Sequence, residues 1–186
     1  MSEPQRQICL LAPHPRTPCA AVRTITVRLE AGLGQGLRLE YELAGAVGRV
    51  RLPPQAPPGR AEGLWRHTCC EAFIAAGPGA AYAELNFSPS GQWAAYGFSD
   101  YRAGMAPLAL EAPRIELQSG AERLVLCAAI SWPHPLAPAG QPRARLGLAT
   151  VVEEDSGALS YWALAHPRER PDFHDPRGFA LTLPVP

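Results

Sequence analysis

Polar and aromatic side chains are concentrated in one short stretch, NFSPSGQWAAYGFSDYR, at residues 86–102. Its SPSG segment suits a type I turn, and Gly91 can adopt the left-handed conformation that closes a bulged hairpin. If Ser88 pairs with Gln92, the alternation of side chains along a strand places five residues on one face: Tyr82, Glu84, Asn86, Tyr96 and Phe98. Aromatic rings stack on the C–H faces of sugars, and carboxylates and amides form hydrogen bonds with hydroxyls. This face is typical of a site for a polyhydroxylated ligand.

The same face also has a purely structural interpretation. Glu84 can pair with a nearby arginine such as Arg102, and the tyrosines can be partly buried partners across neighbouring strands. The opposite face of the hairpin is expected to lie in the core and consists of four apolar residues: Leu85, Phe87, Trp93 and Ala95. At the level of sequence both interpretations of the polar face stay open.

The two serines of the hairpin are candidate nucleophiles. A serine nucleophile needs a base within reach and usually a strained elbow such as GxSxG, whereas Ser88 and Ser90 lie in an ordinary turn. Their hydroxyls are expected to bond to backbone amides of the turn. A triad of Ser90, a histidine and Asp100 is the alternative, and we expect no catalytic residue and no enzyme activity.

A second group of reactive side chains lies in LWRHTCCEAF at residues 64–73. On a strand, His67, Cys69 and Glu71 share one face, and these residue types can ligate a metal. No second pair follows at ligand spacing, so a buried cysteine beside a hydrogen-bonded histidine is the favoured interpretation. We expect no metal, and Trp65 is a candidate stacking ring.

The third stretch is YWALAHPRERPDFHDPRGFALTL at residues 161–183. Two apolar segments flank a loop that contains the candidates His166, Asp172, Phe173 and His174. Charged residues on loops are ordinarily solvated. An aromatic ring between two hydrogen-bonding residues, however, is typical of the rim of a ligand site.

The elements that must position these residues are short strands separated by turns. Period-two alternation or apolar runs predict strands at residues 24–30, 37–44, 47–52, 67–75, 82–88, 92–98, 114–118, 124–131, 145–152, 159–166 and 179–183. The Pro-rich segment 53–63 is expected to be a surface loop outside any sheet, and segments 133–142 and 167–178 to be long and irregular. No amphipathic helix of three turns is evident. About ten strands of this kind indicate an all-β antiparallel sandwich or closed barrel.

The totals exclude several classes of function. A chain of 186 residues suits a single domain at 1–186. Seventeen basic residues balance seventeen acidic ones, which argues against a nucleic-acid or membrane partner. No apolar run is long enough for a signal peptide or a membrane span, and five cysteines without a CxxC pair suit reduced thiols. We expect a cytoplasmic protein.

At three stretches, residues 64–73, 82–105 and 161–174, the sequence resembles bacterial DOMON-like proteins, relatives of the family-9 carbohydrate-binding modules. The resemblance implies a β-sandwich of two packed antiparallel sheets that binds ligands, with sugars in some members of the wider superfamily and haem in others. Haem would need an axial methionine, for which Met105 is the internal candidate, opposite one of four histidines: His67, His134, His166 or His174.

The sequence therefore predicts a non-catalytic module that binds a carbohydrate or another small polar ligand, without a cofactor. The candidate ligand-binding residues are Trp65, His67, Glu71, Tyr82, Glu84, Asn86, Tyr96, Arg102, His166, Asp172, Phe173 and His174. Trp65 and Tyr96 would stack, Glu71 would bond hydroxyls together with its polar neighbours, and the two loop histidines would close the site. The alternatives are a haem-binding domain and a structural domain with a protein partner, in which the same residues form a buried network.

Overall fold

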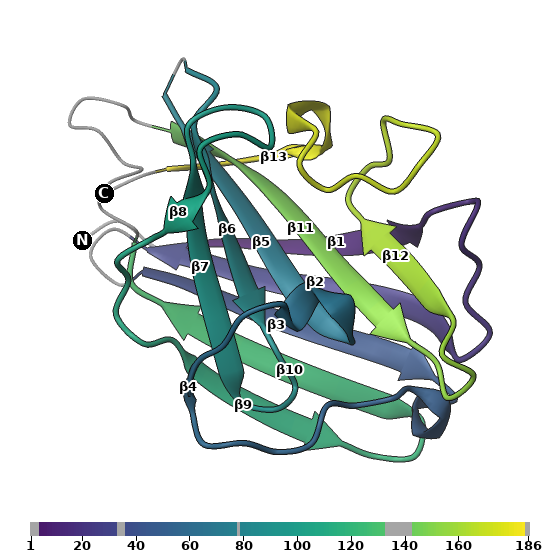
Figure 1. The fold of residues 1–186 in the computed structure, drawn as a ribbon. Helices are drawn as coiled ribbons and strands as arrows, with labels where there is room; N and C mark the ends of the chain where they lie inside the picture. The colour runs from purple at the N-terminus through teal and green to yellow at the C-terminus, as the bar shows by residue number, and fades with distance from the viewer. Residues whose placement is uncertain (1–3, 33–35, 78, 133–142, 185–186) are drawn as a thin grey trace.

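The computed structural model describes residues 4–32, 36–77, 79–132 and 143–184 (Figure 1). Within these ranges the chain forms thirteen strands and three short 3-10 helices. All strand pairs are antiparallel except one short pair. The predicted all-β antiparallel fold is confirmed.

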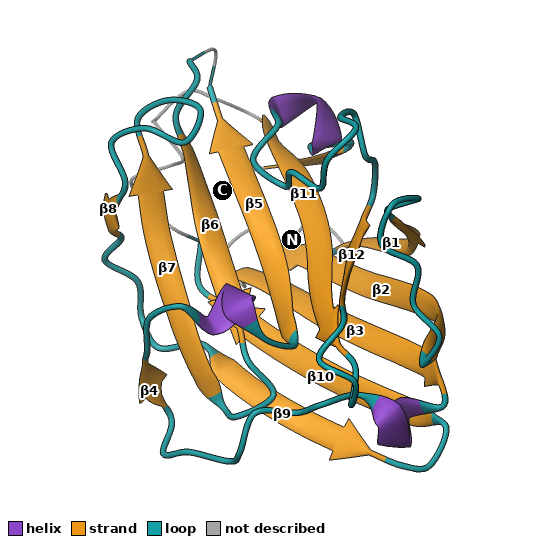
Figure 2. Cartoon of the chain, turned by 45° about the vertical axis from the view of Figure 1, so that its right-hand side comes forward, coloured by secondary structure: helices purple, strands orange, loops and turns teal. Residues whose placement is uncertain are grey.

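The strands form two layers (Figures 1 and 2). Sheet A has the order β1 (Gln5–Pro13), β2 (Val22–Gly32), β3 (Gly36–Gly45), β10 (Arg123–Ile130) and β9 (Arg114–Ser119). Sheet B has the order β4 (Gly59–Arg60), β7 (Gln92–Phe98), β6 (Tyr82–Phe87), β5 (Cys69–Ala76), β11 (Arg143–Glu153) and β12 (Leu159–Ala163). In sheet B, β13 (Leu181–Pro184) also pairs with β11, and β8 (Ala106–Pro107) with β7. Strand β1 joins the layers, because its first part pairs with β2 and its last two residues pair with β12.

The main core lies between the two sheets. Alternation along β2 and β3 turns one face of each strand inward, against the inner faces of β5, β6 and β11. Tyr41 on β3 is fully buried, and its hydroxyl donates a hydrogen bond to the backbone carbonyl of Glu71, at 2.8 Å. This bond links sheet A to the strand that carries much of the candidate site.

A second, smaller apolar cluster covers the outer face of sheet B. Its buried members are Phe73, Ala75, Tyr82, Phe98, Ala149, Ala163 and Phe179. Phe73 stacks on Phe179 at 5.9 Å between ring centroids, and Tyr82 stacks on Phe98 at 4.7 Å. Phe179 follows the loop after β12, so this loop is packed onto the sheet. Sheet B is therefore covered on both faces.

The predicted hairpin register is confirmed in full. Ser88 N donates to Gln92 O at 2.9 Å, and Glu84 lies opposite Tyr96. Gly91 has a φ of +87°, the left-handed conformation that the turn requires. All four residues that were predicted to face the core do so: Leu85, Phe87, Trp93 and Ala95.

Other expectations were wrong. Residues 47–52 do not form a strand, since Val47–Arg49 is a 3-10 helix (η1) followed by an isolated bridge at Val50. The Pro-rich segment does enter a sheet, because Gly59 and Arg60, which follow its prolines, retain backbone donors and pair in parallel with β7. Strand β1 was not predicted, since its short apolar run was considered only as a targeting signal. Segment 133–142 lies outside the described residues.

Gly147 on β11 allows Phe179 to pack against the sheet. A Cβ atom at this position would lie 2.7 Å from Phe179 Cδ1. Gly147→Ala is therefore expected to lower the free energy of unfolding by about 1–2 kcal/mol, because overpacking forces neighbours to shift. Urea denaturation measures this, with Gly48→Ala as the control because its Cβ would meet nothing within 4 Å. Equal stabilities of the two variants would refute this packing role.

Candidate functional site

The polar residues predicted to share a face lie together on β5 and β6. Glu71 pairs with Asn86 across these strands, and Glu84 lies two residues before Asn86 on the same face. Asn86 Nδ2 donates to Glu84 Oε1 at 2.7 Å. Glu71, Glu84 and Asn86 are 3%, 5% and 0% exposed, so they form the floor of the face under other side chains. Glu71 Oε1 is buried without a hydrogen-bond partner among the described residues.

Burial determines the charge state of these two carboxyls. It raises the pKa of Glu71 well above its ordinary value, and the nearby Glu84 raises it further. Burial also raises the pKa of Glu84, while its bond from Asn86 and the charge of Arg102 oppose this change. Two adjacent buried carboxyls cannot both ionise cheaply. The floor therefore favours a neutral carboxylic acid at Glu71.

His174 covers one end of this floor. Its Nδ1 lies 2.7 Å from the hydroxyl of Tyr82, and its Nε2 lies 3.6 Å from Glu84 Oε2. Its ring packs edge-on against Phe73 and Phe98. Burial, with the charge of Arg102, lowers the pKa of His174 to about 4. At pH 7 this imidazole is neutral.

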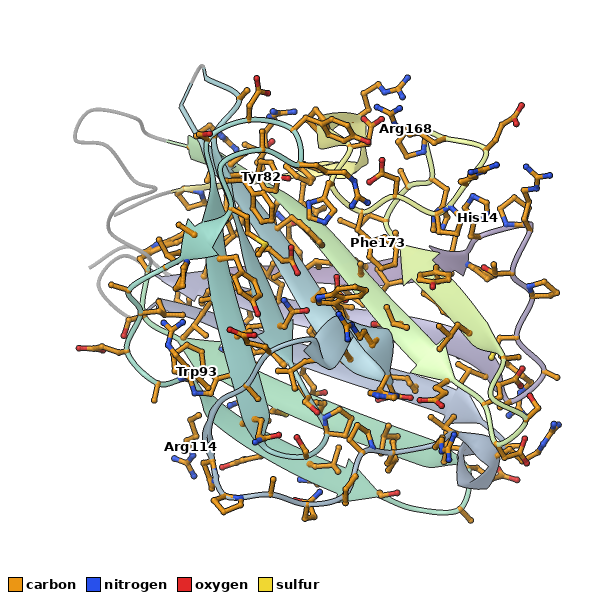
Figure 3. All side chains as sticks on the ribbon, viewed as in Figure 1. His14, Tyr82, Trp93, Arg114, Arg168 and Phe173 are labelled. Carbon is orange, nitrogen blue, oxygen red and sulfur yellow. The ribbon has the colours of Figure 1, made fainter. Side chains whose placement is uncertain are left out.

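Ion pairs stabilise the loop that carries His174 and join it to the connection after β7, which contains Arg102. Asp172 accepts a hydrogen bond from Arg102 Nη2 at 2.8 Å. Asp175 is buried and accepts from Arg168 Nε at 2.6 Å and from Arg177 Nη2 at 2.7 Å. These bonds lower the pKa of Asp175 far below its ordinary value. Figure 3 shows Arg168, Tyr82 and Phe173 at the same end of the molecule.

The other end of the face carries an accessible aromatic ring. Trp65 lies on the 3-10 helix η2 (Leu64–Arg66), which contacts β5, β6 and β7 and crosses in front of β5 and β6 in Figure 2. The ring is 47% exposed, whereas the other tryptophans are buried. Arg66 places its guanidinium 5.2 Å from the ring centroid. Tyr96 on β7 is partly exposed, and burial is the main cause of its raised pKa.

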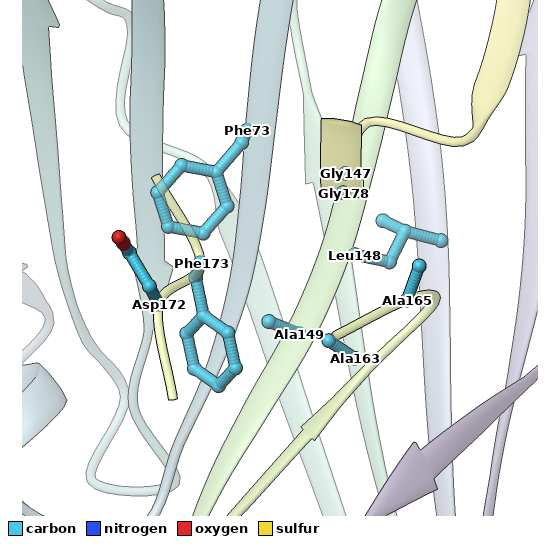
Figure 4. A pocket seen from close by; sticks show the side chains of 9 residues that line it. All are labelled: Phe73, Gly147, Leu148, Ala149, Ala163, Ala165, Asp172, Phe173 and Gly178. Atoms are coloured by element: carbon cyan, nitrogen blue, oxygen red, sulfur yellow. The ribbon is translucent and has the colours of Figure 1, made fainter. Parts of the chain in front are cut away.

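A small pocket lies beside the polar floor (Figure 4). Its volume is about 10 Å³, which suits about one water-sized group. Phe73 and Phe173 line one side, and Ala149 and Ala163 lie below them. Ala149 is the cross-strand partner of Glu71, and Phe73 follows Glu71 on the same face of β5. The pocket therefore lies next to the position of Glu71 on the sheet, and Asp172 is the acidic residue that lines it.

The structure does not bring every predicted residue into this group. His67 lies 2.7 Å from Glu153 and is mostly exposed. His166 Nε2 lies 2.8 Å from the carbonyl of Ala12, and its ring reaches only the outer side of Phe173. The predicted pairing of Glu84 with Arg102 is not formed, because Arg102 bonds to the loop instead.

Sequence reasoning missed the small residues that shape the pocket. Three small residues face outward from sheet B: Gly147 and Ala149 on β11, and Ala163 on β12. The loop after β12 covers them, and aromatic rings line the pocket beside them. The alternating GLA segment at 147–149 was a usable signal, because small outward residues on a strand permit close approach of other groups.

The remaining candidates are the hairpin serines, the cysteines and the possible haem ligands Met105 and His134. Ser88 Oγ accepts from Ser90 N at 3.2 Å, and Ser90 Oγ accepts from Gln92 N at 3.3 Å, so the serines bond to the turn as predicted. The five cysteines are free. Within the described ranges no three His, Cys, Asp or Glu residues are grouped to hold a metal, and no helix could cross a membrane. Met105 is 62% exposed, and His134 lies outside the described residues.

Comparison with known proteins shows the class of fold. No protein-family model and no curated protein matches the chain. A crystal structure from Bacteroides uniformis, described as a "putative carbohydrate-binding protein", matches with a TM-score of 0.69 at 17% identity, over 97% of this chain and 87% of that one. The chain therefore shares the fold of that protein.

A weaker likeness is to a family-9 carbohydrate-binding module from Caldicellulosiruptor kristjanssonii in complex with cellotriose. It has a TM-score of 0.49 and 8% identity, over 92% of this chain and 84% of that one.

Proposed function

We propose that this protein is a non-catalytic binding module for a carbohydrate or another small polar ligand, held on the outer face of sheet B beside Trp65. The fold shared with the Bacteroides uniformis protein agrees with this proposal. So do the three stretches that resemble DOMON-like proteins, because each contributes to the face: Trp65 from the first, the hairpin from the second and the loop with His174 from the third.

The exposed side chain of Trp65, on a helix that contacts the strands of the polar floor, carries the proposal. A large aromatic side chain that stays exposed costs hydrophobic free energy, and such rings are common where a ligand stacks. Trp65 is presented by a helix that contacts three strands of sheet B, so its position is fixed by the sheet. Binding surfaces on rigid elements bind with less loss of conformational entropy.

The unpaired oxygen of Glu71 favours a ligand site over a purely structural hydrogen-bond network. Buried polar atoms are nearly always hydrogen-bonded in folded proteins, and an unpaired one is costly. Glu71 Oε1 lacks a partner among the described residues. A ligand hydroxyl or amine could satisfy it. Since His174 covers the floor, entry requires the loop that carries Phe173 and His174 to move, as binding loops often do.

Isothermal titration calorimetry with neutral and amino monosaccharides and disaccharides tests the proposal. We expect at least one of these sugars to bind, and Trp65→Ala to weaken that binding about tenfold or more, because aromatic anchors dominate binding energy. The control is Leu10→Ala, which removes another exposed apolar side chain, on β1 in sheet A. Binding that is insensitive to Trp65→Ala, or absent for every sugar, would refute the proposal.

A further inference from the structure

We propose that the ligand of this site carries a protonated amine, as an amino sugar does, and that its ammonium group enters beside Glu71. This inference rests on the proposed function, whose ligand class it narrows. It follows from the arrangement of carboxyls, rings and small residues on the outer face of sheet B.

The acid pair provides the first argument. Glu71 and Glu84 project from the same face of adjacent strands, and both are buried. Glu84 already accepts a hydrogen bond from Asn86, whereas Glu71 Oε1 has no partner among the described residues. An ammonium group has three donors and no acceptor. It would match a site with an excess of acceptor oxygens.

The neighbouring pocket has the size and lining for such a group. It has room for about one water-sized group, which an ammonium fits and a sugar ring does not. The rings of Phe73 and Phe173 line it, and aromatic rings attract cations. Small residues, Ala149 and Ala163, complete the lining beside Glu71. A ligand could insert its amine here while its ring remains nearer the surface.

The basic side chains around the floor are paired or neutral. The nearest guanidinium on the loop side, that of Arg102, bonds to Asp172 at 2.8 Å. His174 faces Glu84 and is neutral at pH 7, because its pKa is about 4. Arg66 lies over Trp65 and outside the floor. A carboxylate-bearing ligand would instead meet two carboxyls in a poorly solvated place.

The proposed binding step includes a proton transfer. In the free protein Glu71 holds a proton, because burial and Glu84 raise its pKa. When an ammonium group pairs with Glu71, the ionised form is favoured, so the carboxyl O–H bond breaks and its proton leaves to the buffer. No electron transfer and no covalent bond to the ligand are involved. Amine binding should therefore release a proton at pH values where the carboxyl of the free protein is protonated.

Calorimetry with glucosamine, N-acetylglucosamine and glucose tests this inference. Glucose is the size-matched control, since it has a hydroxyl in place of the amine, and N-acetylglucosamine removes the charge but adds an acetyl group. We expect glucosamine to bind about tenfold more tightly, as charge-assisted hydrogen bonds are the strong ones. The binding enthalpy of glucosamine should differ between buffers of different ionisation enthalpy, because the buffer takes up the released proton. Glu71→Gln should reduce the preference for glucosamine to about twofold or less, with Glu116→Gln as an exposed control.

Two results would overturn the inference in distinguishable ways. If glucose or N-acetylglucosamine binds as tightly as glucosamine, the amine preference is wrong while the carbohydrate-binding function stands. If none of the three sugars binds and no other sugar does, the proposed function fails as well. The proton measurement uses the unmodified protein, so it decides the question even if Glu71→Gln folds poorly.

Discussion

Replacing Phe73 with alanine is expected to lower the free energy of unfolding by about 3–5 kcal/mol, the usual cost of removing a buried aromatic ring. Phe73 is 1% exposed and packs on Phe179 and against His174 and Phe173. The ring therefore fastens the loop after β12 to sheet B. Urea denaturation measures the loss, and Phe73→Leu, which retains most of the volume, should lose about 1 kcal/mol.

The same variant should expose the loop to protease more than its global stability explains. Arg168 and Arg177 are exposed trypsin sites on this loop. Leu39→Ala is the control, because Leu39 is fully buried on sheet A, away from the loop. At matched fractions unfolded, trypsin should cut the loop faster in Phe73→Ala than in Leu39→Ala. Equal cleavage would mean that Phe73 does not hold the loop.

Replacing Glu71 with glutamine is expected to stabilise the protein at neutral pH. In the folded protein the pKa of Glu71 is raised well above the ordinary value of 4.5, mainly by burial. Above pH 4.5 the unfolded chain ionises this carboxyl, whereas the folded protein must keep it protonated or bury a charge. Glutamine has the same shape and removes this cost.

The pH dependence gives the sign of this effect. A carboxyl with a raised pKa in the folded state contributes fully to stability below the unfolded pKa, and this contribution is lost as pH rises toward the folded pKa. The advantage of Glu71→Gln should therefore be near zero at pH 4 and grow up to pH 7. Denaturation at several pH values measures it, and the exposed Glu116→Gln should show no such trend. A pH-independent loss of stability in Glu71→Gln would contradict a neutral Glu71.

The parts of the fold that could be predicted are those governed by local rules. The hairpin register at Ser88 and Gln92 follows from turn chemistry and the period of two, and both depend on adjacent residues. Segment 47–52 has the apolar alternation of a strand, yet Val47–Arg49 forms the 3-10 helix η1. Contacts with residues distant in the sequence can override such a local preference for a strand.

The polar face on β5 and β6 could be predicted, but its burial could not. The face with Glu84 and Asn86 was correctly assembled, because alternation decides which side chains share a face. Its burial depends on a loop much later in the chain, where His174 reaches Tyr82 and Glu84. No periodic pattern encodes such a long-range contact. The pocket was missed for the same reason. Its alanines line a pocket only because aromatic rings, one of them from a distant loop, lie over them.

The central claim is that a ligand binds on the outer face of sheet B at Trp65. The most direct test follows the indole N–H signals of the four tryptophans by nuclear magnetic resonance while the sugar that binds most tightly in calorimetry is added. Only Trp65 is exposed, and Trp93, Trp132 and Trp162 are buried. The account predicts a saturable shift of the Trp65 signal with the other three nearly unchanged. A saturating ligand that leaves the Trp65 signal in place would contradict it.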